Sequence, residues 1–316
     1  MPDAPLFTVF TATYNRAHTL HRVFDSLRVQ TLRDFEWLVI DDGSTDGTRE
    51  LIAEWAAGAD FPIRYFMQDH AGKHIAHNLA AREAHGQFFL PLDSDDAYVP
   101  QALERMAYQW NTIPAHERPS FCGVAGLCVD QHGKLVGERF PSDPLDADMR
   151  ERHYVHRIRG EKCVAMVTAV VRRFPFPEIA LGQYLPEGIV WLEMAKTFKI
   201  RWVNEVLRIY YIDDAEPGVS VARKRNLGAH ATGRWHYYVW LLNNDLEYFF
   251  HSPTPFLKAA LMLPVVGWLG NRSFKSVLAS LENERAKVLV CLALPLALLI
   301  YAGARVRTLA KPLAKT

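Results

Sequence analysis

The chain has 316 residues, 49 % apolar and 22 % charged, so it can fold around a large core and is neither disordered nor collagen-like. A formal net charge of +1 gives no reason to expect a nucleic-acid partner. The four cysteines lack metal-ligand spacing, indicate no disulfide framework and fit a reducing compartment. The N-terminus lacks the pattern of a signal peptide, so we expect the bulk of the chain in the cytosol.

Short apolar runs and helical patterns alternate over the first 110 residues. Because this alternation is typical of βαβ units, it predicts an α/β fold with a mostly parallel, doubly wound sheet. Ligands of such sheets bind beyond the carboxyl ends of the strands, where polar clusters lie in this sequence. The expected strands are 6–12, 35–40, 63–68 and 87–93, and the expected helices are 18–30, one after 48, 73–84 and 99–110.

The alternation loosens from about Ser120. A strand pair is expected at 121–130 and 134–140 and a further strand at 162–171, followed by a helix at 189–198 and a strand or strand pair at 201–211. The polar segment 213–226 contains Pro217, Gly218 and several cations, and is either a lid over a bound ligand or a surface loop.

Two apolar runs, 259–270 and 288–304, set the C-terminal part apart. The second run, at 1.5 Å per residue, spans roughly 25 Å and barely reaches across a bilayer core. Basic residues lie on both sides of it, which does not favour a clean single span. We therefore expect interfacial or re-entrant helices on an anionic membrane face, the alternative being two buried core or dimer helices. The basic residues are Arg272, Lys275, Arg285, Lys287, Arg305, Arg307, Lys311 and Lys315.

Acidic residues end two of the expected strands. Asp93 and Asp95 alternate in LDSDD, and hard carboxylate oxygens suit Mg²⁺ or Mn²⁺ together with diphosphate oxygens. The alternative is that Asp95 or Asp96 caps the next helix. Asp42 ends the second strand, where a carboxylate can accept from a uracil imide or bind a ribose hydroxyl.

The segment HAGKHIAHN places Lys73 at a helix start, which favours anions. Its three histidines, His70, His74 and His77, are most simply surface residues, and no further convergent ligand suggests zinc. No GxGxxG follows the first strand, which argues against a dehydrogenase.

The four segments TATYNR, VIDDGSTDGT, GKHIAHN and LPLDSDD, in this order, resemble the family 2 glycosyltransferases of the GT-A fold. The resemblance covers residues 6–110 closely and 160–212 more loosely. It implies that Asp42 contacts uracil, that Asp95 binds the metal, and that Asp93 binds the ribose or the metal. It also implies that Lys73 lies near the nucleotide and that the nucleotide base is contacted by Thr11, Thr13 and Tyr14.

The same resemblance makes Glu187, in PEGIVWLEMA, the candidate general base. Only one acid stands where the family often has a Glu-Asp pair, and Glu193, six residues into the helix, competes for the role but is expected to face solvent. Ala12 stands where the family commonly has Pro.

The resemblance implies an inverting transferase that needs Mn²⁺ or Mg²⁺ and moves a sugar from a nucleotide-sugar donor, UDP-linked by preference, onto an acceptor hydroxyl. The acceptor is expected to be a cell-surface polysaccharide or a lipid-linked glycan at the cytoplasmic face of the membrane. The alternatives are a non-catalytic nucleotide-sugar-binding membrane scaffold and a metal-dependent nucleotidyltransferase. The expected domains are a GT-A domain at 1–215, with a nucleotide-binding half at 1–115 and an acceptor half at 116–215, and a helical region at 216–316.

Overall fold

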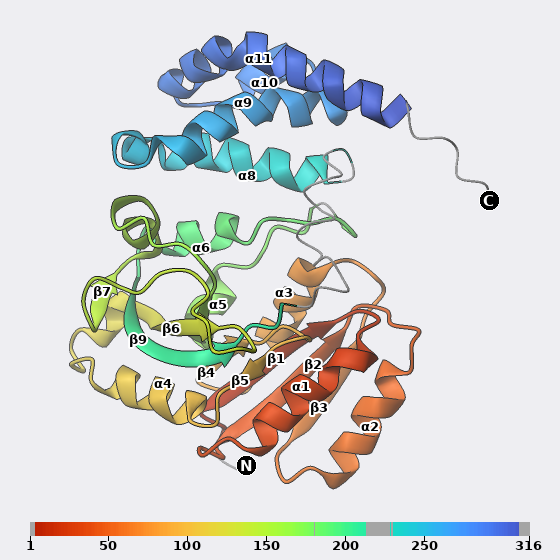
Figure 1. Cartoon of the computed structure of the whole chain (residues 1–316), viewed down its shortest axis with the longest axis vertical. Helices are drawn as coiled ribbons and strands as arrows, with labels where there is room; N and C mark the ends of the chain where they lie inside the picture. Colours follow the sequence, from red (N-terminus) through yellow and green to blue (C-terminus); the bar gives the residue numbers. More distant parts are fainter. Residues whose placement is uncertain (1–3, 180, 213–227, 229, 310–316) are drawn as a thin grey trace. The chain divides into compact units, whose positions relative to one another are not determined.

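The computed structural model describes residues 4–179, 181–212, 228 and 230–309 (Figure 1). The chain divides into two compact units. The first unit comprises 1–182 and 190–216, and the second comprises 183–189 and 217–316. The short stretch 183–189 thus groups with the C-terminal helices, whereas the sequence suggested one boundary near 215. The expected lid at 213–226 lies outside the described residues.

One mixed sheet, in the order β3-β2-β1-β4-β8-β6-β9-β5, organises the first unit (Figure 1). Its first four strands are all parallel, with Phe7 opposite both Phe35 and Phe88, so the predicted α/β fold is confirmed there. The strands are β1 (Phe7–Thr13), β2 (Phe35–Asp41), β3 (Ile63–Met67) and β4 (Phe88–Pro91). The helices between and after them are α1 (Ala17–Arg28), α2 (Thr48–Gly58), α3 (Lys73–Glu83) and α4 (Ala102–Asn111).

The other half of the sheet is largely antiparallel. The central strand of this half, β6, pairs antiparallel with β8 and parallel with β9, while β5 and β7 both pair antiparallel with β9. The strand bounds are β5 (Ala97–Tyr98), β6 (Phe121–Val129), β7 (Leu145–Ala147), β8 (Lys162–Val167) and β9 (Lys199–Ile209). The helical segments are η1 (Arg118–Ser120), η2 (Glu151–Val155), α5 (Thr168–Arg173) and α6 (Gly188–Met194).

Two expectations for this half were wrong. Residues 134–140 do not pair with β6 as a strand, because only Leu135 bridges to Val129. The strand expected at 162–171 stops at Val167, and α5 begins at Thr168. The Thr168 hydroxyl donates to the carbonyl of Gly86, 2.6 Å away, which ties the turn to the loop before β4.

Helices cover both faces of the parallel half, which explains why every residue of β2 is buried. On one face, Phe24 of α1 stacks on Trp55 of α2 with centroids 4.5 Å apart, and both rings pack near Trp37. On the other face α3 lies close to the sheet, because its inward residues include the small Ala76 and Ala80. The parallel half of the sheet is therefore packed between two layers of helices.

The second unit consists of helices: α8 (Ala231–Asn244), η3 (Leu246–Phe250), α9 (Pro253–Leu269), α10 (Phe274–Ala279) and α11 (Glu284–Leu309). Among them, α9 packs against α8, α10 and α11. Phe256, Leu263 and Val266 of α9 are fully buried, so the apolar run 259–270 belongs to a core helix of this unit. This burial favours the alternative of a core helix over an interfacial helix for this run.

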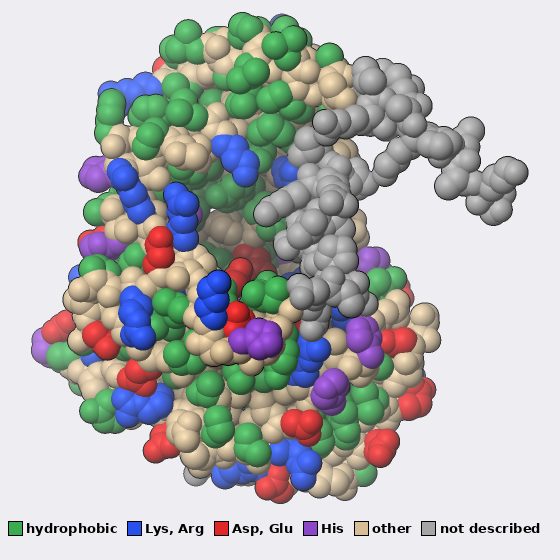
Figure 2. Space-filling model, in the orientation of Figure 1, with side chains coloured by type: hydrophobic (Ala, Val, Ile, Leu, Met, Phe, Trp, Pro, Cys, Tyr) green, Lys and Arg blue, Asp and Glu red, His purple; other side chains and the backbone are tan. Residues whose placement is uncertain are grey.

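Helix α11, unlike α9, is largely exposed. Only 17 % of its most apolar 18-residue window is buried, and the 21 residues Glu284–Ala304 are long enough and apolar enough to cross a membrane. Val290 and Ala297 face inward, while large apolar side chains on the rest of the helix are exposed. Figure 2 shows hydrophobic side chains gathered over α11 at the top of the view. The exposed set is Val288, Leu292, Leu296, Leu298 and Leu299.

Candidate active site

The loops that follow β1 and β2 are joined by hydrogen bonds. Asn15, in the left-handed region at φ 52°, accepts from the backbone of Thr45 at 2.8 Å, and its own N–H donates to the Ser44 hydroxyl at 2.9 Å. The Asp46 carboxylate accepts from the Ala17 N–H at 2.9 Å and from the Thr48 hydroxyl at 2.6 Å. Asp46 therefore ties the starts of α1 and α2 together, which is a structural role.

Asp42 organises the loop that leads into α3. Its carboxylate accepts from the Gln68 side chain at 2.7 Å and from the backbone N–H groups of Ala71 and Gly72, both at 2.9 Å. The His70 imidazole lies 2.9 Å from the same carboxylate. Because Asp42 is only 4 % exposed and already has these partners, it holds residues 68–72 in place from the end of β2.

The residues predicted to contact the nucleotide base differ in how exposed their side chains are. Tyr14 is exposed and stacks on His70, with ring centroids 4.2 Å apart and an angle of 25° between the rings. The Thr13 hydroxyl is buried and has no hydrogen-bond partner in the described part of the chain. The Thr11 hydroxyl is also buried and accepts from the Trp37 indole at 3.1 Å, which gives it a structural bond inside the sheet.

The loop after β4 carries the acidic cluster. Asp93 accepts from Lys73 and from Arg208 of β9, each at 2.7 Å. Asp96 is buried and accepts from the Arg208 guanidinium, with Nε at 2.7 Å, and from the backbone of Tyr211 at 3.0 Å. Asp95 is half-buried, and no other residue among those described donates a hydrogen bond to its carboxylate or forms an ion pair with it. Asp95 is thus the member of the cluster that can take a ligand.

The surroundings of the three carboxyl groups shift their pKa values in different directions. Burial opposes ionisation of Asp93, but Lys73 and Arg208 hold its pKa well below the usual range. Burial and the charge of Asp93 raise the pKa of Asp95, although the charges of Arg16 and Arg208 oppose the shift. Burial also raises the pKa of Asp96, to about 7, although Arg208 opposes the shift. The raised pKa of Asp95 reflects an unfavourable negative charge, which a bound cation would stabilise.

The acidic cluster fits a divalent cation only in part. Within the described ranges, no three His, Cys, Asp or Glu side chains converge to hold a metal by themselves. Mg²⁺ and Mn²⁺ commonly use one or two carboxylates and complete their shell with phosphate oxygens and water. Asp95, with Asp93 beside it, meets that requirement, so the donor set suits a metal that arrives with a diphosphate.

The histidines of α3 are not surface residues, contrary to the expectation for His74 and His77. Both are about 5 % exposed. The His74 Nε2 lies 2.9 Å from the carbonyl of Ile179, and burial lowers the pKa of its imidazole. The His77 ring packs edge-on against Phe89 and Phe176, with centroids about 5 Å away. Only His70, which is half-exposed, lies at the surface as expected.

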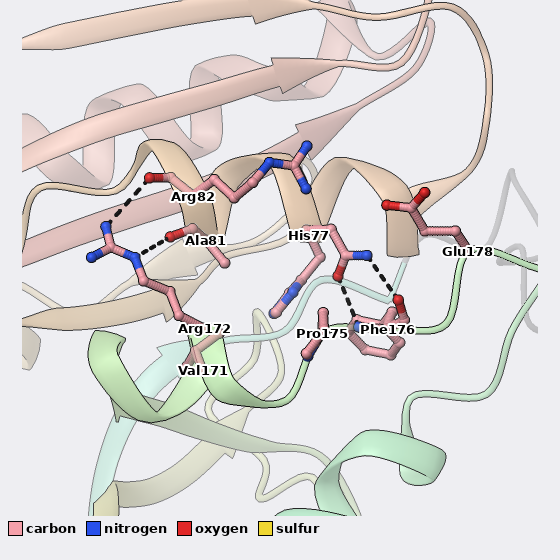
Figure 3. A pocket seen from close by; sticks show the side chains of 9 residues that line it. His77, Ala81, Arg82, Val171, Arg172, Pro175, Phe176 and Glu178 are labelled. Carbon is pink, nitrogen blue, oxygen red and sulfur yellow. Dashed lines mark hydrogen bonds between the residues drawn. The ribbon is translucent and has the colours of Figure 1, made fainter.

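A pocket of about 510 Å³ lies beside the C-terminal half of α3. His77 and Phe176 line it together with Arg172 of α5 (Figure 3). Arg172 donates to the backbone carbonyls of Ala81 at 2.8 Å and Arg82 at 3.3 Å, near the end of α3 (Figure 3). Because a cation there stabilises the helix C-terminus, Arg172 has a structural explanation.

Glu187 directly precedes α6, in the stretch 183–189 that groups with the second unit. Its predicted role as base is not tested by the geometry and stays a prediction. The competing Glu193 forms a 2.7 Å ion pair with Lys196 three residues on, which fits the expected surface position.

Sequence reasoning missed Arg208, which joins two members of the acidic cluster. It is 6 % exposed and lies in the apolar stretch VLRIYY. A lone arginine inside an expected buried strand is a usable signal, because buried charges are nearly always paired. His70 was missed as a partner of Asp42, and adjacency in sequence gave no clue to that contact.

Known proteins resemble this chain in sequence and in fold. Residues 8–116 match the model of glycosyl transferase family 2. A GalNAc(5)-diNAcBac-PP-undecaprenol beta-1,3-glucosyltransferase of Campylobacter jejuni is 25 % identical over 68 % of this chain and 69 % of its own length. The chain spans between 16 % and 69 % of the lengths of the first curated relatives it matches, and less than two thirds for four of those five.

Two solved structures share the fold. S. aureus TarS in complex with UDP-GlcNAc aligns with a TM-score of 0.55 and 18 % identity, over 91 % of this chain and 79 % of its own. A mannosyltransferase from Pyrobaculum calidifontis, in complex with GDP-Man and Mn²⁺, aligns with a TM-score of 0.57 and 20 % identity, over 96 % of this chain and 83 % of its own. Residues 8–116 therefore belong to glycosyl transferase family 2, and the chain has the GT-A fold.

Proposed function

We propose that the protein transfers a sugar from a UDP-sugar to an acceptor hydroxyl, with inversion at the anomeric carbon. The observation that carries this proposal is the cluster after β4. An Asp95 carboxylate that accepts from no other described residue lies beside Asp93, whose own charge is balanced by Lys73 and Arg208. Such a set suits a diphosphate that brings its own metal, and it lies at the edge of the sheet where α/β folds bind ligands.

The donor site is assigned to the loops at that edge. Asp95 and Asp93 would hold Mn²⁺ or Mg²⁺, which would supply positive charge against the diphosphate. Tyr14 offers an exposed ring for the base, and the buried Thr13 hydroxyl retains a hydrogen bond to give. Asp42 would share its carboxylate between residues 68–72 and the uracil imide. Thr11 would contribute through its backbone, because its hydroxyl bonds Trp37.

The transfer step needs a base, and Glu187 is assigned this role. Its carboxylate takes the proton of the acceptor hydroxyl, while the acceptor oxygen forms a bond to the anomeric carbon and the bond from that carbon to the diphosphate breaks. Lys73, on release from Asp93, would stabilise the negative charge of the departing UDP. A single displacement of this kind inverts the anomeric configuration.

The acceptor is proposed to be held at a membrane. The exposed apolar face of α11 supports a site at the cytoplasmic surface of an anionic bilayer. The C. jejuni relative is named for an undecaprenol-diphosphate-linked substrate, which supports a role in making cell-surface polysaccharide or lipid-linked glycan.

A donor screen tests the proposal. The purified chain is incubated with UDP-, GDP- and dTDP-sugars, with Mn²⁺ or Mg²⁺ and then with EDTA, and slow release of the nucleotide is followed. Metal-dependent release from a UDP-sugar is expected. Binding of a nucleotide-sugar without any turnover would favour the membrane scaffold. Release of pyrophosphate from a nucleoside triphosphate and a sugar phosphate would favour a nucleotidyltransferase. Neither binding nor release with any of these donors would exclude the proposal.

The role of Glu187 is tested with Glu187→Gln. Because the amide keeps the shape of the side chain but cannot accept a proton, turnover is expected to fall by about 10²–10⁴-fold with donor affinity unchanged. Glu193→Gln is the matched control and should retain activity. Near-normal turnover of Glu187→Gln would remove Glu187 from the mechanism.

A further inference from the structure

Arg22 lies in the middle of α1 and has no part in the transfer as described so far. Its Nη1 donates to the backbone carbonyl of Asp95 at 3.1 Å, across 73 positions of the sequence. The same guanidinium lies over the ring of Tyr211, 4.2 Å from the centroid. Arg22 thus joins the loop that carries the predicted metal ligand to the residues that follow β9.

The helix that carries Arg22 is fixed beside this loop. Gln30, just beyond the end of α1, is buried. Its side-chain amide donates to the carbonyl of Val99 at 2.9 Å and accepts from the N–H of Leu103 at 3.2 Å. Because a hydrogen-bonded helix is stiff, these contacts also fix the place of Arg22 along the chain that begins at Asp95.

The chain around Tyr211 is fixed as well. Strand β5 pairs antiparallel with β9, and this register, continued by two residues, places Tyr211 opposite Asp95. The Tyr211 N–H donates to the Asp96 carboxylate at 3.0 Å. The next residue, Ile212, exchanges two hydrogen bonds with the Gln131 side chain, at 2.9 and 3.0 Å. The Tyr211 ring is therefore a fixed support for the Arg22 guanidinium, in the geometry of a cation–π contact.

The direction of the Asp95 carboxylate depends on its backbone, because no other residue in the described ranges donates a hydrogen bond to the carboxylate itself. Burial and repulsion from Asp93 disfavour its negative charge, although Arg16 and Arg208 offset part of the effect. The loop would therefore gain by turning this carboxylate toward water. A charged donor on the Asp95 carbonyl fixes one of the two peptide planes beside the side chain, so Arg22 opposes such a rotation.

We propose that Arg22 is a positioning residue of the donor site: it holds the Asp95 carboxylate, through the Asp95 backbone, where a divalent cation can bind it, and Tyr211 holds Arg22 in turn. This assignment rests on the proposed glycosyl transfer. Arg208 already holds the carboxylates of Asp93 and Asp96 directly. Because metal–ligand distances tolerate deviations of only about 0.2 Å, a small shift of the loop weakens the cation and the diphosphate that comes with it.

The test measures the affinity for UDP with Mn²⁺, by calorimetric titration into the full chain. Arg22→Gln is compared with the wild type and with Arg28→Gln, which removes the same charge from an exposed position of the same helix. Arg22→Gln is expected to bind at least about tenfold more weakly and to need more Mn²⁺ for half-maximal binding, while Arg28→Gln matches the wild type. Arg22→Lys keeps the charge and a donor, so it should recover part of the affinity. Equal affinity of Arg22→Gln and wild type overturns the proposal.

A second comparison tests whether Arg22 acts through Asp95. Asp95→Asn and the double variant Arg22→Gln, Asp95→Asn are titrated in the same way. Because the effect of Arg22 requires the Asp95 carboxylate, the double variant is expected to bind no more weakly than Asp95→Asn alone. A further loss of about tenfold would mean that Arg22 contacts the donor itself, and this result also overturns the proposal.

The support under Arg22 is tested with Tyr211→Leu, which removes the ring, and Tyr211→Phe, which keeps it. Tyr211→Leu is expected to weaken UDP binding as Arg22→Gln does, and Tyr211→Phe should lose less. Melting temperatures of all variants are measured alongside, and a loss of affinity found only together with a lowered melting temperature would make Arg22 a structural residue and overturn the proposal. If the wild type binds no UDP with Mn²⁺, the proposed function fails and this assignment fails with it. Normal binding by the wild type and by every Arg22 variant removes this assignment alone.

Discussion

Asp42 and Asp95 both follow apolar strands, yet the structure gives them opposite surroundings. Asp42 is buried and accepts hydrogen bonds from residues 68–72. Asp95 is half-buried and accepts from no other described residue. The difference arises from a loop that is distant in sequence, so spacing alone could not tell a carboxylate that organises a loop from one that is open to a ligand.

Asp42→Ala is predicted to destabilise the protein even without a nucleotide. The substitution leaves the partly buried N–H of Ala71 and the buried N–H of Gly72 without their acceptor, and the expected loss is about 2–4 kcal/mol of unfolding free energy. Chemical denaturation of the ligand-free protein measures it. The exposed Asp25→Ala on α1 should change stability by less than about 0.5 kcal/mol. Equal stability of the two variants would show that Asp42 has no structural role.

At the level of elements, Glu205 of β9 fastens α4 to the sheet. Its carboxylate accepts from Arg105 at 2.7 and 2.8 Å and from Gln109 at 2.5 Å. The hydrogen bonds from Arg105 are the main reason that the pKa of Glu205 is lowered. Because the folded pKa lies below the unfolded one, the stabilisation is complete above the unfolded pKa and is lost as the pH falls through the folded pKa.

Glu205→Gln is therefore predicted to lower stability by about 1–2 kcal/mol near pH 7, and by much less near pH 3. Thermal unfolding of wild type and variant across this pH range measures the difference. Glu54→Gln, on an exposed position of α2, should show no such pH dependence. A difference that stays constant down to pH 3 would mean that the ionised carboxylate is not what holds α4.

The strands of the parallel half of the sheet were predictable from sequence because each one is short, apolar and followed by turn-forming residues. Residues 134–140 and 168–171 were wrongly predicted as strand, because a short segment with a few apolar residues does not distinguish a strand from a helix or a loop. His74 and His77 were expected at the surface, and the structure buries both. Their burial depends on residues 176–179, about 100 positions further on, which no local pattern reveals.

At the scale of the whole molecule, the two C-terminal apolar runs differ in burial. The run in α9 forms the core of the second unit, and α11 exposes Leu292, Leu296 and Leu299. Composition could not separate them, since both are apolar and short. The inward face of α11 packs on α9 and its other face is apolar and exposed, and we predict that this exposed face lies in the surface of a membrane.

The triple variant Leu292→Gln, Leu296→Gln, Leu299→Gln is predicted to weaken binding to anionic vesicles by at least about tenfold, because burial of each leucine in the interface contributes more than 1 kcal/mol. Co-sedimentation with vesicles measures it. Val29, Met67 and Tyr108, exposed apolar residues of the first unit, provide a control triple of glutamine substitutions that should bind normally. Unchanged binding of the α11 variant, or resistance of the wild type to alkaline extraction, would contradict an interfacial helix.

The central claim is that Asp95 and Asp93 bind the diphosphate of a UDP-sugar through a divalent cation. Its most direct test is calorimetric titration of a UDP-sugar into wild type and Asp95→Asn, with Mn²⁺ and with EDTA, and with the exposed Asp25→Asn as control. We predict that wild type and control bind the donor only with Mn²⁺, and that Asp95→Asn binds at least about tenfold more weakly under the same conditions. Donor affinity that is the same with EDTA as with Mn²⁺, or unaltered in Asp95→Asn, would contradict the account.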